Sequence, residues 1–367
     1  MVDHHKGRPR GAAPTSSRKL IMSRWTLKRW IFWIAFLCLI LAGVGGASLS
    51  LGAVTIPLSR TWSILLHRLF GLTSGWASSD SSIILDLRLP RTISGVLVGG
   101  ALSLAGAVLQ ALLRNPLADP FVMGISSGAA VGAVLAILIG LGSTFLGNYA
   151  VPGAAFGGAL STLLLVYSIA RIQGRVPTQT LLLAGVIVSS FFSAIIMFLI
   201  SVTSNEKIYN ITFWLMGSLE FLSSRSLGVI FVYLLVGGGV LFALARDLNL
   251  LVLGEETASE LGVEVERVKK IVFVFASLIT GAVVSVSGLI GFVGLVVPHL
   301  VRMIWGPDHR FLLPASVLMG GILLVAADTL ARTVMAPSEI PVGVVTAMGG
   351  APFFVYLLRK KGHAVYH

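Results

Sequence analysis

Charged residues are scarce in this sequence: Asp, Glu, Lys and Arg make up 11% of its 367 residues, whereas 56% are hydrophobic. The mean hydropathy is +0.93. Soluble globular domains carry roughly 25% charged residues, so this composition excludes an ordinary soluble protein. The sequence predicts an all-α integral membrane protein, because a helix satisfies its own backbone hydrogen bonds in lipid.

Motifs for several kinds of chemistry are also absent. The single cysteine, Cys38, excludes an internal disulfide and a thiolate metal site. No HExxH sequence is present, which argues against a membrane metalloprotease, and no GxxxxGK[ST] sequence is present to cradle ATP. We therefore expect no catalytic residue and no bound metal. If this membrane protein moves a substrate uphill, the energy must come from a partner.

Ionisable groups are nearly absent from the apolar runs. Asp328 is the one acidic residue inside a predicted span, and Arg332 follows it by four residues. A secondary transporter or pump normally needs ionisable groups within the membrane to bind its coupling ion. Because residues four apart meet on one helix face, we expect a local ion pair here instead.

Long apolar runs are abundant. About 20 helical residues cross a hydrocarbon core of ~30 Å. The number of crossings is least distinct at 271–305, where the apolar run is too long for one crossing and the glycines of SGLIGFVG favour a turn between two. The ten predicted spans are residues 31–52, 92–112, 121–141, 149–170, 180–201, 226–245, 271–288, 290–304, 312–331 and 341–358.

The basic residues indicate orientation. The net charge of +12 could suggest a nucleic-acid partner, but with alternating spans 20 of the 27 Lys and Arg fall inside and 7 outside. This is the positive-inside bias, so we expect both termini in the cytoplasm and no nucleic acid as partner. The predicted domains are a disordered basic cytoplasmic tail at 1–30 and a ten-span membrane domain at 31–367. A signal peptide ending near GGAS is the alternative interpretation of the N-terminus.

One connection is unusually acidic. Residues 246–270 hold six of the 15 acidic residues, in a segment predicted to lie inside. The pattern favours a short helix from Glu255, a break at Gly262 and a second helix from Val263. Three nearby side chains are expected to form an apolar contact patch: Ala258, Leu261 and Val263. The residues alone leave open whether this segment is a solvated loop or a docking surface.

Three further patterns concern helices. TIPLSRTWSILLHRLFG, in the long outside connection 53–91, is typical of an amphipathic helix on the membrane surface. Gly124, Gly128 and Gly132 have the spacing that lets helix backbones approach closely. LVGGA from residue 97 and LITGA from residue 278 are a faint echo, consistent with two inverted sets of five spans.

Several long motifs carry a family resemblance. LRLPRTISGVLVGGALSLAGAVLQALLRNPLADPFVMGISSGA begins at residue 87, and LLLAGV, LGEETASELGV, GFVGLVVPHLVRMIWGPDHRFLLP and IPVGVVTAMGGAPFFVYLL follow in order. From about residue 31 the chain resembles the permease subunits of bacterial type II ABC importers for iron chelates, haem and cobalamin, the FecCD type.

The resemblance implies an assembly in the bacterial inner membrane. Such permeases are homodimers of ten-span subunits, each an inverted five-plus-five repeat, with a central pathway on the dimer axis. Two ATP-binding subunits dock on the cytoplasmic side, and a periplasmic or lipid-anchored binding protein delivers substrate outside. This chain would bind no cofactor, since ATP and Mg are held by the partner ATPase.

The resemblance also implies roles for particular residues. A cytoplasmic gate is expected at Asn115, Leu117, Thr178 and Gln179, where Gln179 departs from the serine of the family's best-known cobalamin permease. The segment 246–270 would be the coupling segment, with ATPase docking by Gly254, Glu255, Glu256, Ala258, Leu261, Gly262 and Val263. Docking of the binding protein is expected at Arg88, Arg91 and Arg332, because a guanidinium group can hold a carboxylate through two hydrogen bonds.

The function expected is translocation of an iron chelate, a ferric siderophore or haem, by alternating access driven by partner ATPases. Cobalamin is the alternative substrate. An ATP-independent channel or secondary carrier is the alternative class of protein.

Overall fold

The computed structural model describes residues 27–71, 78–141, 147–220 and 223–365. These residues form helices and the turns between them, with one isolated bridge between Ile172 and Arg175 and no β-strand among the described residues. The predicted all-α class is confirmed.

Seven helical stretches among the described residues are long and apolar enough to cross a membrane. They contain α1 (Leu27–Ser50), α4 (Leu89–Leu112), α6 (Ala150–Ala170), α7 (Thr178–Ser201), α9 (Ser224–Ala243), α12 (Val265–Ser287) and α14 (His309–Thr333). Shorter apolar helices are α5 (Ile125–Leu138), α13 (Val293–Trp305) and the first part of α15 (Val342–Val365). Each of the ten predicted apolar runs therefore contains a helix.

The helix bounds correct the predicted limits in two places. Because α1 begins at Leu27, residues 27–30 belong to a helix and not to the predicted tail, whose residues 1–26 lie outside the described residues. The run at 121–141 gives a shorter helix, because the 3-10 helix η2 (Pro120–Met123) and Gly124, with a φ of 83°, precede α5. At 288–292 the chain turns as predicted, between the end of α12 and the start of α13.

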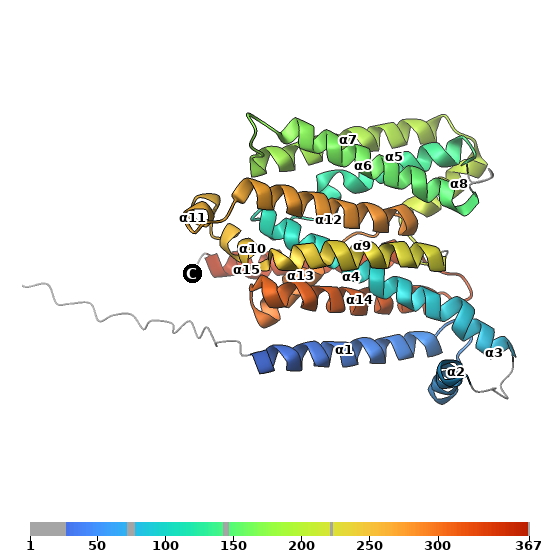
Figure 1. Cartoon of the computed structure of the whole chain (residues 1–367). Helices are drawn as coiled ribbons and strands as arrows, with labels where there is room; N and C mark the ends of the chain where they lie inside the picture. Colours follow the sequence, from blue (N-terminus) through green and yellow to red (C-terminus); the bar gives the residue numbers. More distant parts are fainter. Residues whose placement is uncertain (1–26, 72–77, 142–146, 221–222, 366–367) are drawn as a thin grey trace, which may run out of the picture.

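The bundle has two distinct ends (Figure 1). The short helices α10 (Ala245–Leu251) and α11 (Glu255–Glu260) project from one end, where α1 begins and α15 finishes. This is called the α11 end below. At the opposite, α2 end lie α2 (Leu58–Phe70), α3 (Ser78–Ser82) and the π-helix η1 (Ile83–Arg88), which leads directly into α4. The helix α8 (Asn205–Met216), which the sequence analysis did not predict, also lies toward the α2 end (Figure 1).

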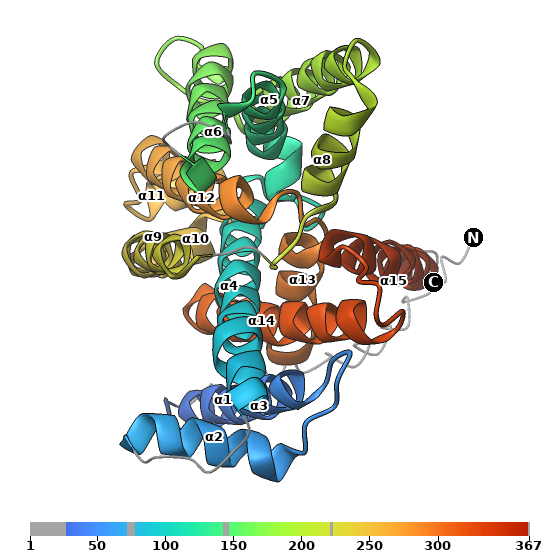
Figure 2. The same cartoon turned by 90° about the vertical axis from the view of Figure 1, so that its right-hand side faces the viewer.

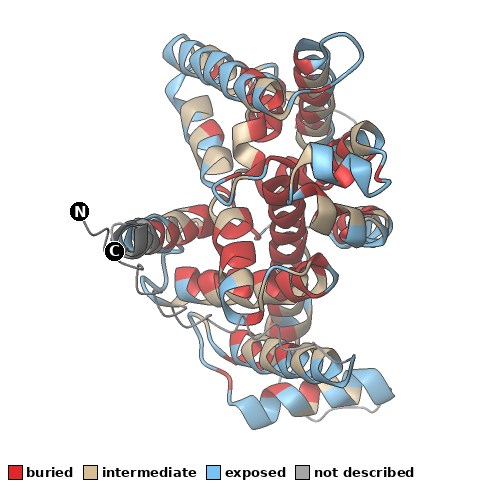
Figure 3. Cartoon of the chain, turned by 90° about the vertical axis from the view of Figure 1, so that its left-hand side faces the viewer, coloured by how far each residue is buried: buried red, intermediate tan, exposed pale blue. Residues whose placement is uncertain are grey.

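Helix α4 forms the centre of the bundle (Figures 2 and 3). It packs against α14, α12, α13 and α9, and it is buried along nearly its whole length. Helices on the periphery instead expose large apolar side chains, such as Leu39 on α1, Leu183 on α7 and Leu235 on α9. Extensive exposed apolar surface is unusual for a soluble monomer, so this distribution fits a bundle surrounded by lipid.

Small residues set the closest helix contacts. A Cβ atom added at Gly99 of α4 would lie 2.2 Å from the carbonyl oxygen of Gly320 in α14. One added at Gly128 of α5 would lie 2.7 Å from the carbonyl oxygen of Gly158 in α6. Backbones can approach this closely only where side chains are missing. The predicted close packing is confirmed for Gly128 and Gly132, whereas Gly124 forms the turn before α5.

The predicted amphipathic helix is α2, which lies across the end of the bundle rather than along it (Figure 2). One stripe of its surface carries exposed apolar side chains: Leu58, Trp62, Leu66, Leu69 and Phe70. The helix is confirmed, and its position on a membrane surface stays a prediction.

Candidate functional site

The coupling segment has the predicted shape. Helix α11 begins at Glu255, after Gly254 with a φ of 131°. It ends at Glu260, and Gly262 adopts a φ of 88° before α12 starts at Val265. Because glycine lacks a Cβ, it reaches these positive φ values without the strain other residues would suffer. The two glycines thus hold α11 as a separate short helix that projects from the bundle.

A hollow of about 1460 Å³ lies at the α11 end. Its wall includes the predicted gate residues Thr178 and Gln179, from the start of α7, and Arg114, which immediately precedes the other predicted gate residues. The predicted docking residues on this wall are Gly254, Glu255, Glu256 and Val263. Residues from separate parts of the sequence are therefore brought together, with the start of α7 beside α11.

The RNPLADP segment makes a tight turn between α4 and η2. Arg114 has a φ of 48°, and the backbone N–H of Leu117 donates to Asn115 Oδ1 over 2.9 Å. Asn115 therefore shapes its own loop, whereas Leu117 is exposed. Asp119 accepts a hydrogen bond from the N–H of Phe121 and caps η2. Burial raises the pKa of Asp119 to about 6.

Glu255 bonds within the chain. Its Oε1 accepts a hydrogen bond from Thr178 Oγ1 over 2.7 Å, and its Oε2 lies 2.9 Å from Lys269 Nζ. The Nη2 atom of Arg114 is 3.9 Å from Oε1. Burial alone would raise the pKa of Glu255, but hydrogen bonds from Thr178 and Lys269 and the charges of Lys269 and Arg114 lower it. Glu255 is therefore an ionised contact between α11 and the start of α7.

The expected apolar patch is wrong for two of its three residues. Ala258 and Val263 are buried within the chain, at 0% and 9% exposure, because their side chains complete the packing beneath α11. Leu261 is 59% exposed, and Glu256 is also exposed on the first turn of α11. A partner approaching the α11 end can therefore reach Leu261 and Glu256, and their docking role stays a prediction.

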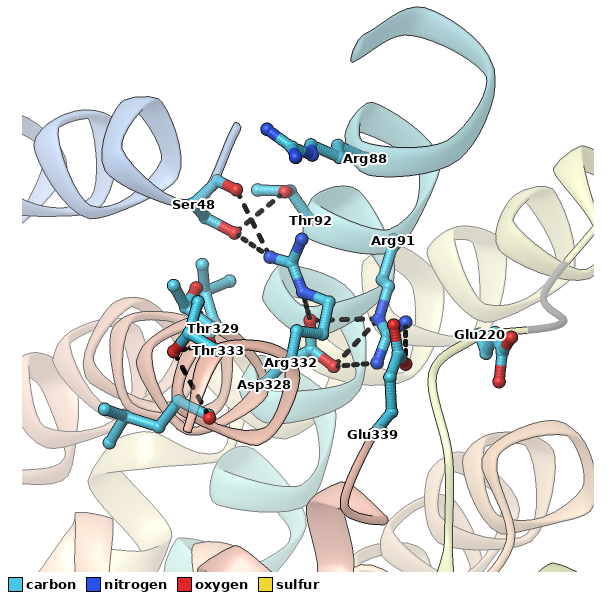
Figure 4. A network of polar contacts seen from close by, with 12 residues as sticks. Ser48, Arg88, Arg91, Thr92, Glu220, Asp328, Thr329, Arg332, Thr333 and Glu339 are labelled. Carbon is cyan, nitrogen blue, oxygen red and sulfur yellow. Dashed lines mark hydrogen bonds and ion pairs between the residues drawn. The ribbon is translucent and has the colours of Figure 1, made fainter. Parts of the chain in front are cut away.

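The three predicted docking arginines at the α2 end have partners within the chain. Figure 4 shows the contacts of Arg91 and Arg332. Arg88 is buried and donates to the carbonyl oxygens of Leu49 and Ser50, over 2.8 and 3.0 Å, and to that of Val54. It thus satisfies backbone carbonyls where α1 ends. The expectation that Arg88 is available to a partner is corrected, because its hydrogen-bonding groups serve its own chain.

Asp328 is the shared acceptor for the other two arginines. Arg332 Nε lies 3.0 Å from Asp328 Oδ2, which confirms the predicted local ion pair, and Arg332 also donates to Ser48 Oγ over 2.8 Å. Arg91 Nε donates to both Asp328 carboxylate oxygens, and Arg91 Nη1 lies 2.7 Å from Glu339 Oε2. Arg332 is buried, which corrects the expectation for it too. Arg91 is nearly buried, with a side-chain exposure of 10%, and its partner Glu339 is 41% exposed.

Sequence reasoning overlooked two residues at the α11 end. Lys269 is buried at 4% exposure and also pairs with Glu266, whose carboxylate oxygen lies 2.6 Å from Nζ. The three-residue spacing of Glu266 and Lys269 on one helix is a signal that could have indicated the pair.

Among the described residues, no group of three or more His, Cys, Asp or Glu side chains could hold a metal ion.

The model of the FecCD transport family matches residues 36–360. The chain belongs to the FecCD transport family. This FecCD chain is 48% identical over 290 residues to the cobalamin import system permease protein BtuC of Halobacterium salinarum, covering 79% of this chain and 77% of that protein. It is 37% identical over 332 residues to the hemin transport system permease protein HmuU of Yersinia pestis, covering 89% and 95%.

A solved structure supports the same relationship. It is a metal-chelate type ABC transporter in an inward-facing conformation, which the FecCD chain resembles with a TM-score of 0.78 and 33% sequence identity. The match covers 90% of this chain and 99% of the other. The FecCD chain is thus a permease subunit of an ABC transporter, a membrane component rather than an enzyme.

Proposed function

We propose that this FecCD chain is one half of a homodimeric ten-span permease in the bacterial inner membrane, which imports a bulky metal chelate by alternating access. The observation that supports this proposal is the hollow at the α11 end. The predicted gate residues Thr178 and Gln179 line it together with residues of the coupling segment. If a partner moves α11, the hydrogen bond between Glu255 and Thr178 can transmit that movement to the gate.

The proposed orientation places the α11 end in the cytoplasm. Helix α1 begins and α15 finishes at this end (Figure 1), as expected for an even number of crossings. The excess of Lys and Arg in the segments of this end supports the same assignment. Two ATP-binding subunits would dock there against Leu261 and Glu256, and they would hold the ATP and Mg. A binding protein would dock at the α2 end, where Arg91 is paired with the exposed Glu339.

Two substrate classes have support. The hemin permease of Yersinia pestis represents the iron chelates that the sequence analysis favoured. The cobalamin permease of Halobacterium salinarum favours cobalamin as a second candidate, because its identity to this chain is 48% rather than 37%. Both are bulky metal chelates, which a wide pathway with few charged groups can release.

Reconstitution tests the proposal. The permease is placed in proteoliposomes with its ATPase and binding protein, and uptake of a ferric hydroxamate, haem and cyanocobalamin is measured with and without ATP. We expect ATP-dependent uptake of one chelate class. Uptake at the same rate without ATP would show a channel or secondary carrier instead. Leu261→Asp should abolish co-purification of the ATPase, and unchanged co-purification would contradict docking at α11.

A further inference from the structure

Lys269 is an unusual residue in the FecCD chain. It lies on the first turns of α12 and its side chain is 4% exposed, whereas the neighbouring Lys270 is exposed. Burying an ammonium group is unfavourable unless the group is paired. Both carboxylates that pair with it, those of Glu255 and Glu266, belong to the coupling segment. The Lys269 ammonium therefore holds α11 against the start of α12.

The same two carboxylates also hold the segment that leads into α7. Glu255 uses its second oxygen to accept from Thr178 Oγ1 over 2.7 Å. Glu266 uses its second oxygen to accept from the backbone N–H of Val176 over 2.9 Å. The segment 176–178 is thus attached to the coupling segment at two points, and one ammonium group orients both acceptors.

The contacts join parts of the chain that are distant in sequence. Thr178 precedes Glu255 by 77 residues, and Val176 precedes Glu266 by 90 residues. Arg114, from the turn between α4 and η2, adds a longer contact of 3.9 Å to Glu255. Charged hydrogen bonds in partly buried surroundings are stronger and more directional than exposed ones. This cluster therefore links both predicted gate segments to the coupling segment.

We propose that Lys269 is a positioning residue that makes the coupling helix α11 and the gate segment 176–179 move as one body. The proposal rests on the proposed function, because a push on α11 is meaningful only if an ATPase docks there. Without the ammonium, Glu266 would lose its ion pair and Glu255 would keep only the longer contact to Arg114. The two carboxylates would then repel each other, so their hydrogen bonds to Thr178 and Val176 would loosen. ATP hydrolysis would then proceed while the gate no longer followed.

The transport experiment compares three variants in the reconstituted complex. Lys269→Met removes the charge at similar length, Lys269→Arg keeps the charge, and Lys270→Met is the matched control on the exposed neighbour. We expect Lys269→Met to assemble with the ATPase and hydrolyse ATP, with substrate uptake per ATP reduced tenfold or more. Lys269→Arg should restore much of the coupling, and Lys270→Met should leave it unchanged. A wild-type ratio in Lys269→Met would overturn the proposal.

A distance measurement separates this proposal from the proposed function. Spin labels are placed at Ser259→Cys on α11 and Arg175→Cys beside the gate segment, in a Cys38→Ser background, and pulsed electron resonance gives their separation. Without any partner or ATP, we expect one narrow distance distribution, which Lys269→Met broadens and Lys270→Met does not. Equal distributions in all three proteins would refute the link. Absence of ATP-dependent uptake by the wild type would instead refute the proposed function.

A milder variant covers the case in which Lys269→Met does not fold. Thr178→Val removes one hydroxyl group and keeps the side-chain shape. It should lower uptake per ATP by a smaller factor than Lys269→Met, with normal assembly. If both variants fold, the double variant should have the same uptake per ATP as Lys269→Met alone, because the two substitutions break the same connection. Fully multiplicative losses would indicate two unrelated effects and would contradict the proposal.

Discussion

Replacing Gly132 with alanine tests the close backbone contact between α5 and α6. The added Cβ would lie 2.2 Å from the carbonyl oxygen of Ala154, 2.9 Å from its carbonyl carbon and 3.2 Å from Cα of Ala155. All three atoms belong to the backbone, so no side chain can rotate away. The two helices must move apart to accommodate one methyl group.

The size of the effect follows from these distances. Close carbon-to-oxygen contacts have separations of about 3.3–3.6 Å, so the backbones of α5 and α6 must separate by about 1 Å. Overpacking of this kind typically costs about 1–3 kcal/mol. Alanine also favours a helix over glycine by about 1 kcal/mol, which offsets part of the loss. Gly157, in the interior of α6, is the matched control. A Cβ added there would have no heavy atom within 4 Å, apart from those of its chain neighbours and its own helix backbone.

The difference between the two variants isolates the packing effect. Both substitutions gain the same helix propensity, so Gly132→Ala should be about 1–3 kcal/mol less stable than Gly157→Ala. The assay is the apparent melting temperature in detergent, from size-exclusion chromatography after heating. We expect Gly157→Ala to melt at or above the wild type and Gly132→Ala to melt below Gly157→Ala. If Gly132→Ala melts as high as Gly157→Ala, the close approach of α5 and α6 is wrong.

Two further predictions concern buried carboxylates. Asp328→Asn leaves the guanidinium groups of Arg91 and Arg332 buried without their shared counter-charge, so we expect a loss of about 3–5 kcal/mol in the free energy of unfolding. Glu339→Gln, at a partner that is 41% exposed, should lose about 1 kcal/mol or less in the same melting assay, and equal losses would contradict this. Because burial raises the pKa of Asp119 to about 6, the folded state disfavours its charged form, and the wild type should lose stability as pH rises from 4 through 6. Asp119→Asn keeps an acceptor for the helix cap but cannot ionise. Its stability relative to the wild type should therefore increase between pH 4 and 6, by at most roughly 3 kcal/mol. If the melting temperatures of the two proteins change in parallel with pH, this prediction is wrong.

Local patterns in the sequence were sufficient for several elements. The helix break at Gly262, the turn at 288–292 and the amphipathic helix α2 depend on residues close to one another in the chain, and all three are present. The pair Asp328 and Arg332 was also predictable, because its members lie one helical turn apart.

Local sequence patterns did not predict which side chains around α11 are buried. Ala258 and Val263 were expected on an apolar contact surface, but they pack inward while Leu261 is exposed. A helix of six residues has apolar residues on more than one side, and its orientation depends on the helices beneath it. The sequence therefore indicated a short helix and could not tell which side chains face a partner.

The sequence by itself determined the class of protein, the apolar helices and the positions of the breaks between them, because hydropathy and glycine placement act locally. Only the tertiary structure decided the partners of the charged groups. Arg332 bonds to Ser48 across 284 residues, and Glu255 bonds to Thr178 across 77. A buried charge must be paired by whatever group the fold brings near it. Arginines expected to bind a partner protein were therefore already paired within the chain, and Lys269, which the sequence analysis did not single out, is joined to Thr178 through Glu255.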